Sequence, residues 1–175
     1  ERSRAVPVRL YWPQSVSRQG RVPLVVFSHG IGGSRRGYSY LGQHWASNGL
    51  ASLHLQHVGS DRELWFGNPL ALVGRLHDAA QDREAIDRAM DLRFALDQLL
   101  GARSEFAPRI DGARIVVAGH SYGANTALLA AAITLSVPVP SMRNISTAGM
   151  CRVTSSASLY SYSWNSPVTG PHESR

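Results

Sequence analysis

The chain has 175 residues, 43% of which are hydrophobic, and a net charge of +6. These values fit a globular domain with a substantial core and exclude a chain that is disordered throughout. All 18 basic residues are arginines, and they lie scattered among acidic residues rather than in a basic patch, so we predict no nucleic-acid partner. The longest apolar run, residues 127–139, is too short to span a membrane.

The pattern of apolar residues along the chain predicts alternating strands and helices. Short apolar runs rich in β-branched residues predict four strands, at residues 5–11, 23–28, 50–55 and 114–118. Apolar residues at helical spacing and glycines at helix ends predict three helices, at residues 38–48, 76–100 and 122–132. Strands that alternate with helices predict an α/β fold, in which helices flank a mostly parallel sheet.

The sequence changes character after Ala132. Residues 133–175 hold ten serines, four threonines and four prolines, and they show no strand or helix period. Eleven of the twelve acidic residues lie within residues 1–121. We therefore expect an N-terminal α/β region at residues 1–132 and an irregular tail at residues 133–175, which is either disordered or the product of a shifted reading frame.

The sequence VVAGHSYGA, residues 116–124, places a serine between two glycines. An apolar strand precedes Ser121 and a helix of small residues follows it, which is the context of a strand–turn–helix that exposes a nucleophilic hydroxyl. Gly119 and Gly123 let the neighbouring backbone approach without a Cβ clash. We expect the side chain of His120 to point away from Ser121. The pattern predicts a serine nucleophile, and a tight glycine turn without catalysis is the alternative.

A glycine-rich loop, HGIGGS at residues 29–34, follows the second predicted strand. Acyl transfer requires preorganised N–H donors where the oxyanion forms. We expect one donor from the residue after the serine, Tyr122, and the other from Ile31, just past His29 and Gly30. The His29 side chain is expected to support this loop through a hydrogen bond. The loop lacks the glycine patterns of nucleotide-binding sites.

These motifs together resemble the α/β-hydrolase superfamily. The segments that carry the resemblance are VVFSHGIGGS, YLGQHWASNGLASLHLQHVGSD, DRAMDLRFALDQL and VVAGHSYGANTALLAAA, all between residues 25 and 132. More narrowly, they are similar to dienelactone-hydrolase-like and platelet-activating-factor-acetylhydrolase-like serine esterases. The resemblance implies hydrolysis of small-molecule carboxylic esters through an acyl-enzyme at Ser121, without a metal or other cofactor. It also implies an exported protein, with the cytoplasm as the alternative location.

The resemblance stops after the helix that follows Ser121. In this family an aspartate and then a histidine come after the nucleophile. Here no aspartate follows Ser121, and the only later acid and histidine are Glu173 and His172, which are adjacent and in reversed order. The earlier histidines are poor candidates for the base: His29, His54, His57 and His120. The sequence therefore predicts a truncated α/β-hydrolase fold that holds a nucleophile and an oxyanion hole without the rest of the triad.

A long loop is expected at residues 57–75, and it carries two large aromatic residues. Trp65 and Phe66 are candidate substrate-pocket residues, or they pack against the edge of the sheet. Asp61 is expected to be a local cap or a solvated loop residue, with a polar contact in the substrate cleft as the alternative. Two other functions stay open: a non-catalytic hydrolase-fold remnant or binding module, and lactonase or peptidase chemistry at the same site. The sequence does not specify an oligomeric state.

Overall fold

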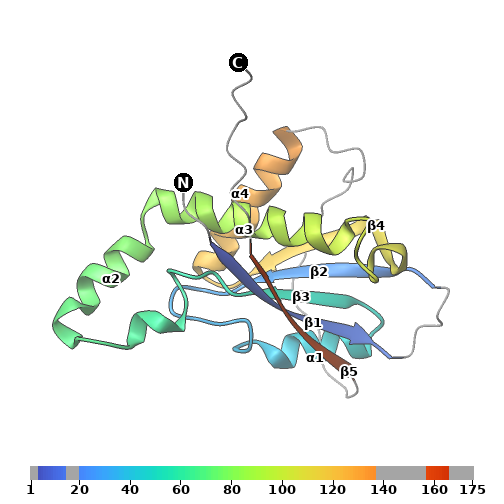
Figure 1. Cartoon of the computed structure of the whole chain (residues 1–175), viewed down its shortest axis with the longest axis horizontal. Coiled ribbons are helices and arrows are strands. Elements are labelled where there is room, and N and C mark those ends of the chain that lie inside the picture. Colours follow the sequence, from blue (N-terminus) through green and yellow to red (C-terminus); the bar gives the residue numbers. More distant parts are fainter. Residues whose placement is uncertain (1–3, 15–19, 137–156, 166–175) are drawn as a thin grey trace.

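The computed structural model describes residues 4–14, 20–136 and 157–165, with residues 133–136 and 157–165 described by their backbone alone. These residues form a five-stranded sheet with the strand order β4-β2-β3-β1-β5 (Figure 1). The strands are β1 (Ala5–Pro13), β2 (Val22–Ser28), β3 (Ala51–Leu55), β4 (Ile110–Gly119) and β5 (Ala157–Asn165). The α-helices are α1 (Ser39–Ser47), α2 (Leu72–Ala79), α3 (Asp82–Leu100) and α4 (Tyr122–Ser136). Three short 3-10 helices complete the described elements: η1 (Arg62–Trp65), η2 (Pro69–Ala71) and η3 (Ala107–Arg109).

The sheet is parallel in its central part and antiparallel at one side. Strand β2 pairs in parallel with β3 and with β4, whereas β1 pairs antiparallel with β3 and with β5. All four predicted strands are present, and the predicted α/β class with helices flanking the sheet is confirmed. Strand β5 lies in the segment where the sequence predicts no strand. Of the tail predicted at residues 133–175, residues 133–136 belong to α4, and residues 137–156 and 166–175 lie outside the described residues.

The single helix predicted at residues 76–100 is wrong in its extent. The structure has two helices, α2 and α3, which are separated at Gln81, where the backbone is extended with φ −69° and ψ 153°. Asp82 and Glu84 lie in the first turn of α3. Acidic side chains stabilise a helix N-terminus because they oppose the positive end of its dipole, which favours a new helix start at Asp82.

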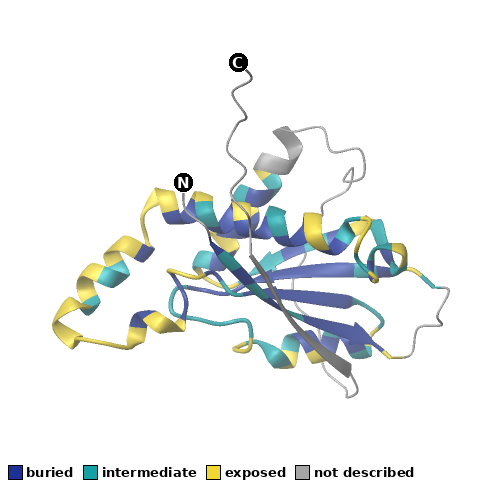
Figure 2. Cartoon of the chain, in the orientation of Figure 1, coloured by how far each residue is buried: buried dark blue, intermediate teal, exposed yellow. Residues whose placement is uncertain are grey.

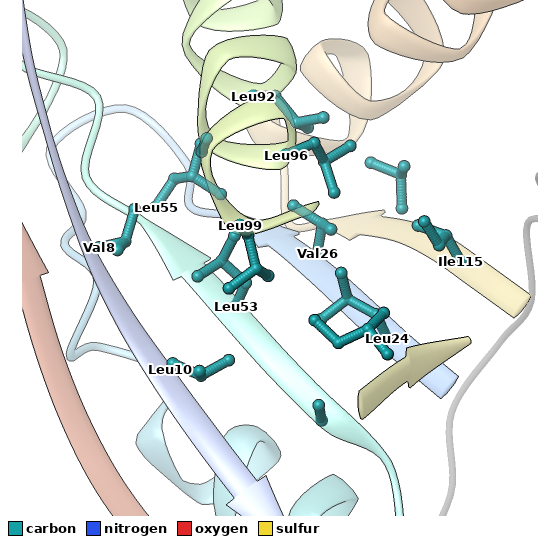
Figure 3. Packing of buried hydrophobic residues seen from close by; sticks show 14 of the residues in the cluster. Val8, Leu10, Leu24, Val26, Leu53, Leu55, Leu92, Leu96, Leu99 and Ile115 are labelled. Carbon is teal, nitrogen blue, oxygen red and sulfur yellow. The ribbon is translucent and has the colours of Figure 1, made fainter. Parts of the chain in front are cut away.

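Helices α3 and α4 cover one face of the sheet, and α1 covers the other (Figure 1). On the first face, leucines of α3 pack onto side chains that point up from the central strands (Figure 3). The packed residues include Leu10, Leu24, Val26, Leu53, Leu55, Leu92, Leu96 and Leu99, each at most 2% exposed. Full burial of one such side chain contributes about 1.5–3 kcal/mol, so this face holds the apolar core.

The opposite face of the sheet is aromatic where α1 crosses it. The rings of Tyr11 and Phe27 lie 4.8 and 5.0 Å from the ring of His54. Helix α1 approaches this layer closely, because a Cβ atom at Gly42 would lie 2.5 Å from the Tyr11 ring. A larger side chain at this position would therefore push α1 off the sheet.

The segment that holds η1, η2 and α2 extends away from the sheet and is largely exposed (Figure 2). It follows β3, and the loop after β2 lies beside its start, where Gly32 N–H donates to Ser60 O at 2.9 Å. Because β2, β3 and β4 are parallel, the loops after them meet at one edge of the sheet, which is where α/β folds place ligands. None of the helices in the described ranges is long and apolar enough to cross a membrane.

Candidate active site

Ser121 occupies the turn between β4 and α4, and its side chain is exposed. Its φ is +53°, and among the described residues it is the only non-glycine residue with a positive φ. This left-handed conformation costs roughly 1–2 kcal/mol. Two backbone hydrogen bonds of 2.9 Å hold the turn, from Gly123 N–H to His120 O and from Ala124 N–H to Ser121 O.

Glycines are required on both sides of this turn. A Cβ atom at Gly119 would collide with the backbone of Gly123. A Cβ atom at Gly123 would collide with the carbonyl oxygen of Ser28 at the end of β2. The two predicted glycines therefore let α4 begin directly against β2, which presents Ser121 at the edge of the sheet.

The predicted oxyanion loop lies against this turn. A Cβ atom at Gly30 would lie 3.3 Å from the His120 carbonyl oxygen and 3.3 Å from Ser121 Cβ. Inside the loop, Gly33 N–H donates to Gly30 O at 3.0 Å. Within the part of the chain that the structure describes, no hydrogen bond occupies the amide N–H of Ile31 or of Tyr122. Neither amide therefore has a hydrogen-bond partner among the described residues.

The His29 side chain lies under this loop and is fully buried. Its Nε2 accepts a 3.1 Å hydrogen bond from His57 N–H, so its Nδ1 carries the proton and donates to Gly30 O at 2.7 Å. Burial lowers the pKa of His29 to about 4, so the ring is neutral at pH 7. Both ring nitrogens are therefore occupied in holding the loop.

His57 lies in a buried chain of hydrogen bonds that the sequence does not predict. Its Nδ1 lies 2.9 Å from Asp91 Oδ2, and its Nε2 lies 2.9 Å from Ser28 Oγ. Burial places the pKa of His57 well below its ordinary value, so a neutral ring donates to Asp91 and accepts from Ser28. Burial also raises the pKa of Asp91 to about 7, against the opposing effect of Arg4.

These hydrogen bonds join Ser28, His57 and Asp91 in the order of a hydrolytic triad, but Ser28 does not face solvent. Ser28 and His57 are 0% exposed, so no substrate reaches the Ser28 hydroxyl. Ser28 Oγ also accepts a 3.1 Å hydrogen bond from Arg88, which stabilises the lone pairs that a nucleophile would use. We therefore assign a structural role to the hydrogen-bonded series Ser28–His57–Asp91.

The other two histidines weighed as a base, His54 and His120, also have partners. His54 is 1% exposed on the aromatic face, its Nε2 lies 2.8 Å from Ser52 Oγ, and burial lowers its pKa to about 3. His120 is exposed, and its Nδ1 lies 2.7 Å from the Tyr38 hydroxyl. Among the described residues, no histidine makes a hydrogen bond with Ser121 Oγ. His172 and Glu173 lie outside these residues.

Four buried charged residues near the site are absent from the predictions. Arg4 binds both carboxylate oxygens of Glu84, at 2.9 and 3.0 Å, and also reaches Asp91 at 2.9 Å. With Arg88, these side chains form a cluster of two cations and two carboxylates, as buried charges require. Residues 84, 88 and 91 are spaced so that they lie on one face of α3, and this spacing is the feature of the sequence that could have predicted the cluster.

The two predicted pocket residues, Trp65 and Phe66, are exposed, and Trp65 contacts the loop at residues 29–34. The indole Nε1 of Trp65 donates to Gly32 O at 2.9 Å, so the ring lies across this loop. Trp65 is 55% exposed and Phe66 is 63% exposed. Asp61 caps η1 by accepting from Glu63 N–H at 3.2 Å. The described residues contain no group of three or more histidine, cysteine or carboxylate side chains that suits a metal ion.

The chain is similar to known proteins in both sequence and structure. Residues 3–62 match the family model of platelet-activating factor acetylhydrolase, isoform II. A ferulic acid esterase from Streptomyces cinnamoneus is 35% identical with a TM-score of 0.54, and the match covers 69% of this chain and 35% of that one. A dienelactone hydrolase from Anabaena variabilis is 19% identical with a TM-score of 0.54, and the match covers 81% of this chain and 56% of that one. No curated protein sequence gives a significant match.

The chain thus spans about a third of the length of the ferulic acid esterase and just over half of the dienelactone hydrolase. The likeness to the dienelactone hydrolase concerns the fold, and the likeness to the ferulic acid esterase extends to the sequence. The described residues form part of an α/β-hydrolase fold, and the chain resembles esterases that have this fold.

Proposed function

We propose that Ser121 is the nucleophile of a serine carboxylic-ester hydrolase. The observation that carries the proposal is the exposed Ser121 at φ +53°, with the loop at residues 29–34 packed against it. A folded chain keeps a strained non-glycine residue only where the surroundings enforce it, and such residues concentrate at functional sites. The resemblance to esterases supports the same conclusion.

The chemistry follows from the positions of three groups. Ser121 Oγ attacks the ester carbonyl carbon, and the negative charge moves to the carbonyl oxygen. The amides of Ile31 and Tyr122 donate to that oxygen, and each such donor contributes about 3–4 kcal/mol to the transition state. A base takes the proton of the Ser121 hydroxyl during the attack and returns it to the leaving oxygen, so the tetrahedral intermediate collapses to an acyl-serine and releases the alcohol. Water then attacks the acyl-serine and releases the acid.

A serine hydroxyl needs a base to become a good nucleophile. The rings of His29, His54 and His57 are buried and hydrogen-bonded elsewhere. The exposed ring of His120 is hydrogen-bonded to Tyr38, and no hydrogen bond joins it to Ser121 Oγ, so we assign the base to a part of the protein outside the described residues. Without its base, a site of this kind keeps about 10³–10⁴-fold acceleration over water, from the oxyanion hole and substrate binding. Trp65 and Phe66 are proposed to contact the acyl or the leaving group.

The test is the reaction of the full chain with a fluorophosphonate, with and without added imidazole as an external base. We expect Ser121 to be labelled slowly, imidazole to accelerate the reaction, and Ser121→Ala to abolish it. Ser47→Ala is the matched control, because it removes a serine hydroxyl of α1 that donates to His44 O at 2.8 Å and lies outside the candidate site. A folded chain that stays unlabelled in imidazole would contradict the proposal and favour a non-catalytic binding module.

A second experiment distinguishes the reaction types. Hydrolysis of short-chain esters, peptides and lactones by the same protein separates esterase activity from peptidase and lactonase activity.

A further inference from the structure

Arg88 is a charged residue of α3 whose side chain is 0% exposed. Its Nε donates to Thr126 Oγ1 at 2.9 Å, and its Nη1 donates to Ser60 Oγ at 2.9 Å. Its Nη2 donates to Ser28 Oγ at 3.1 Å and to the carbonyl oxygen of His29. One guanidinium therefore connects the end of β2, the loop after β3, the start of the oxyanion loop and helix α4.

These contacts reach both segments that carry the proposed oxyanion donors. The His29 carbonyl lies two residues before the Ile31 amide, and a Cβ atom at Gly123 would lie only 2.7 Å from the same carbonyl oxygen. The guanidinium carbon lies 5.0 Å from the centre of the Tyr122 ring, which is within the range of a cation–π contact. Arg88 is thus packed between the loop and the first turn of α4.

We propose that Arg88 is a positioning residue for the oxyanion hole. It fixes the His29 carbonyl and the first turn of α4 relative to each other, so that the amides of Ile31 and Tyr122 converge beside Ser121. The proposal rests on the proposed function of Ser121, and it assigns Arg88 no contact with substrate.

Arginine suits this place better than lysine. A guanidinium is planar and carries five N–H donors in a fixed arrangement, whereas an ammonium concentrates three donors on one nitrogen. The four acceptors of Arg88 lie on three segments, at residues 28–29, 60 and 126, so the three donors of a lysine cannot satisfy them together. Burial lowers the pKa of Arg88 to about 10, so the group stays charged at pH 7.

The test compares Arg88→Lys with Arg93→Lys in the full chain. Arg93 lies on the same helix, is partly exposed and pairs with Asp97 at 3.1 Å, so its replacement controls for loss of an arginine from α3. Two quantities are measured: amide hydrogen exchange along the backbone, and the reaction of Ser121 with a fluorophosphonate in saturating imidazole. The reaction is separated into the inactivation rate constant and the reversible binding constant.

We expect Arg88→Lys to speed exchange at residues 29–34 and 120–126 and to leave α1 unchanged. The inactivation rate constant should fall on the order of tenfold to a hundredfold, because small misplacements of catalytic groups have effects of this size. The binding constant should stay the same, because the oxyanion contacts form in the transition state. Arg93→Lys should change neither quantity.

Unchanged exchange and labelling in Arg88→Lys would overturn the proposal and leave the proposed function intact. Faster exchange spread evenly over the sheet would also overturn it, because it would show general loss of stability. If the unsubstituted chain is not labelled, the proposed function fails, and exchange at residues 29–34 alone decides whether Arg88 holds the loop. If Arg88→Lys does not fold, Thr126→Val removes the α4 acceptor alone, and we expect the same changes confined to residues 120–126.

Discussion

The left-handed backbone of Ser121 depends on the absence of side chains at its neighbours. Strand β4 leads into the turn, and α4 must start at once for the turn to stay against the sheet. The backbone of Gly123 meets the carbonyl oxygen of Ser28 without any intervening side chain. The packing of α4 on β2 therefore supplies the free energy that offsets the strained φ of Ser121.

Replacing Gly123 by alanine should destabilise the protein and displace the turn. The new Cβ atom would collide with the backbone of Ser28, which cannot move as a flexible side chain can. We expect the free energy of unfolding to fall by about 1–3 kcal/mol or more. Chemical denaturation of the full chain measures this loss.

Gly74→Ala is the matched control for this substitution. A Cβ atom at Gly74 would meet nothing within 4 Å, and the residue lies inside helix α2. Alanine is the better helix former by up to about 1 kcal/mol, so this variant should be as stable as the parent chain or more stable. Equal losses in the two variants would show that the contact with Ser28 does not limit position 123.

The sequence could predict the turn around Ser121 but not the charges beneath it. The turn is local, because the strand, the two glycines and the helix lie within a few consecutive residues. Arg88 and Asp91 acquire their partners from the residue before β1, from the end of β2, from the loop after β3 and from α4, which are far away along the chain. A charged residue in a helix usually faces solvent, so the sequence alone favours an exposed position for both.

At the scale of the elements, α3 turns a mixed face toward the sheet. Its C-terminal half packs Leu92, Leu96 and Leu99 into the core, whereas its N-terminal half buries the charged side chains of Glu84 and Arg88. The charged half lies near the loops after β2 and β3, and the apolar half lies over the strands (Figure 3). One helix therefore supports both the candidate site and the core.

This arrangement corrects the helix face that apolar spacing suggests. Ile86 and Met90 fit the apolar pattern of the predicted helix, yet they are 53% and 52% exposed. The polar partners of Glu84 and Arg88 rotate α3 so that its charged residues face inward. The sequence pattern does not contain these partners, so it cannot give the rotation of the helix.

The two faces of α3 differ in what truncation to alanine should do. Leu92 is 2% exposed in the core, so Leu92→Ala should reduce the free energy of unfolding by about 2–5 kcal/mol. Ile86 lies on the same helix but faces solvent, so Ile86→Ala should change it by no more than about 0.5 kcal/mol. Urea denaturation of both variants measures the difference. A larger loss in Ile86→Ala than in Leu92→Ala would mean that the apolar spacing gives the true buried face.

At the scale of the whole molecule, the fold buries several titratable groups at once. His29, His54 and His57 are each at most 1% exposed, and burial lowers the pKa of each ring. Asp91 is 4% exposed, and burial raises its pKa to about 7. These groups lie on both faces of the sheet and on α3, so their protonation reports on the integrity of the whole fold.

The protein should therefore lose stability as the pH falls from about 6.5 to 4. An unfolded chain protonates each histidine near pH 6.5, whereas the folded chain excludes the proton until about pH 4 at His29 and about pH 3 at His54. His57 acts in the same direction. Asp91 opposes them, because between pH 7 and its ordinary pKa of 3.8 the folded state holds a proton that the unfolded state has lost.

Three histidines against one aspartate leave a net uptake of about two protons on unfolding near pH 5, on the order of 2–3 kcal/mol per pH unit. Denaturation of the full chain at pH 7, 6 and 5 measures this slope.

The His54→Gln variant tests the contribution of one buried histidine. The glutamine keeps a partner for Ser52 but cannot titrate, so the slope should fall by about one proton, or about 1.4 kcal/mol per pH unit. A stability that stays constant or rises toward pH 5 would mean that Asp91 outweighs the buried histidines, or that the rings are protonated in the folded state.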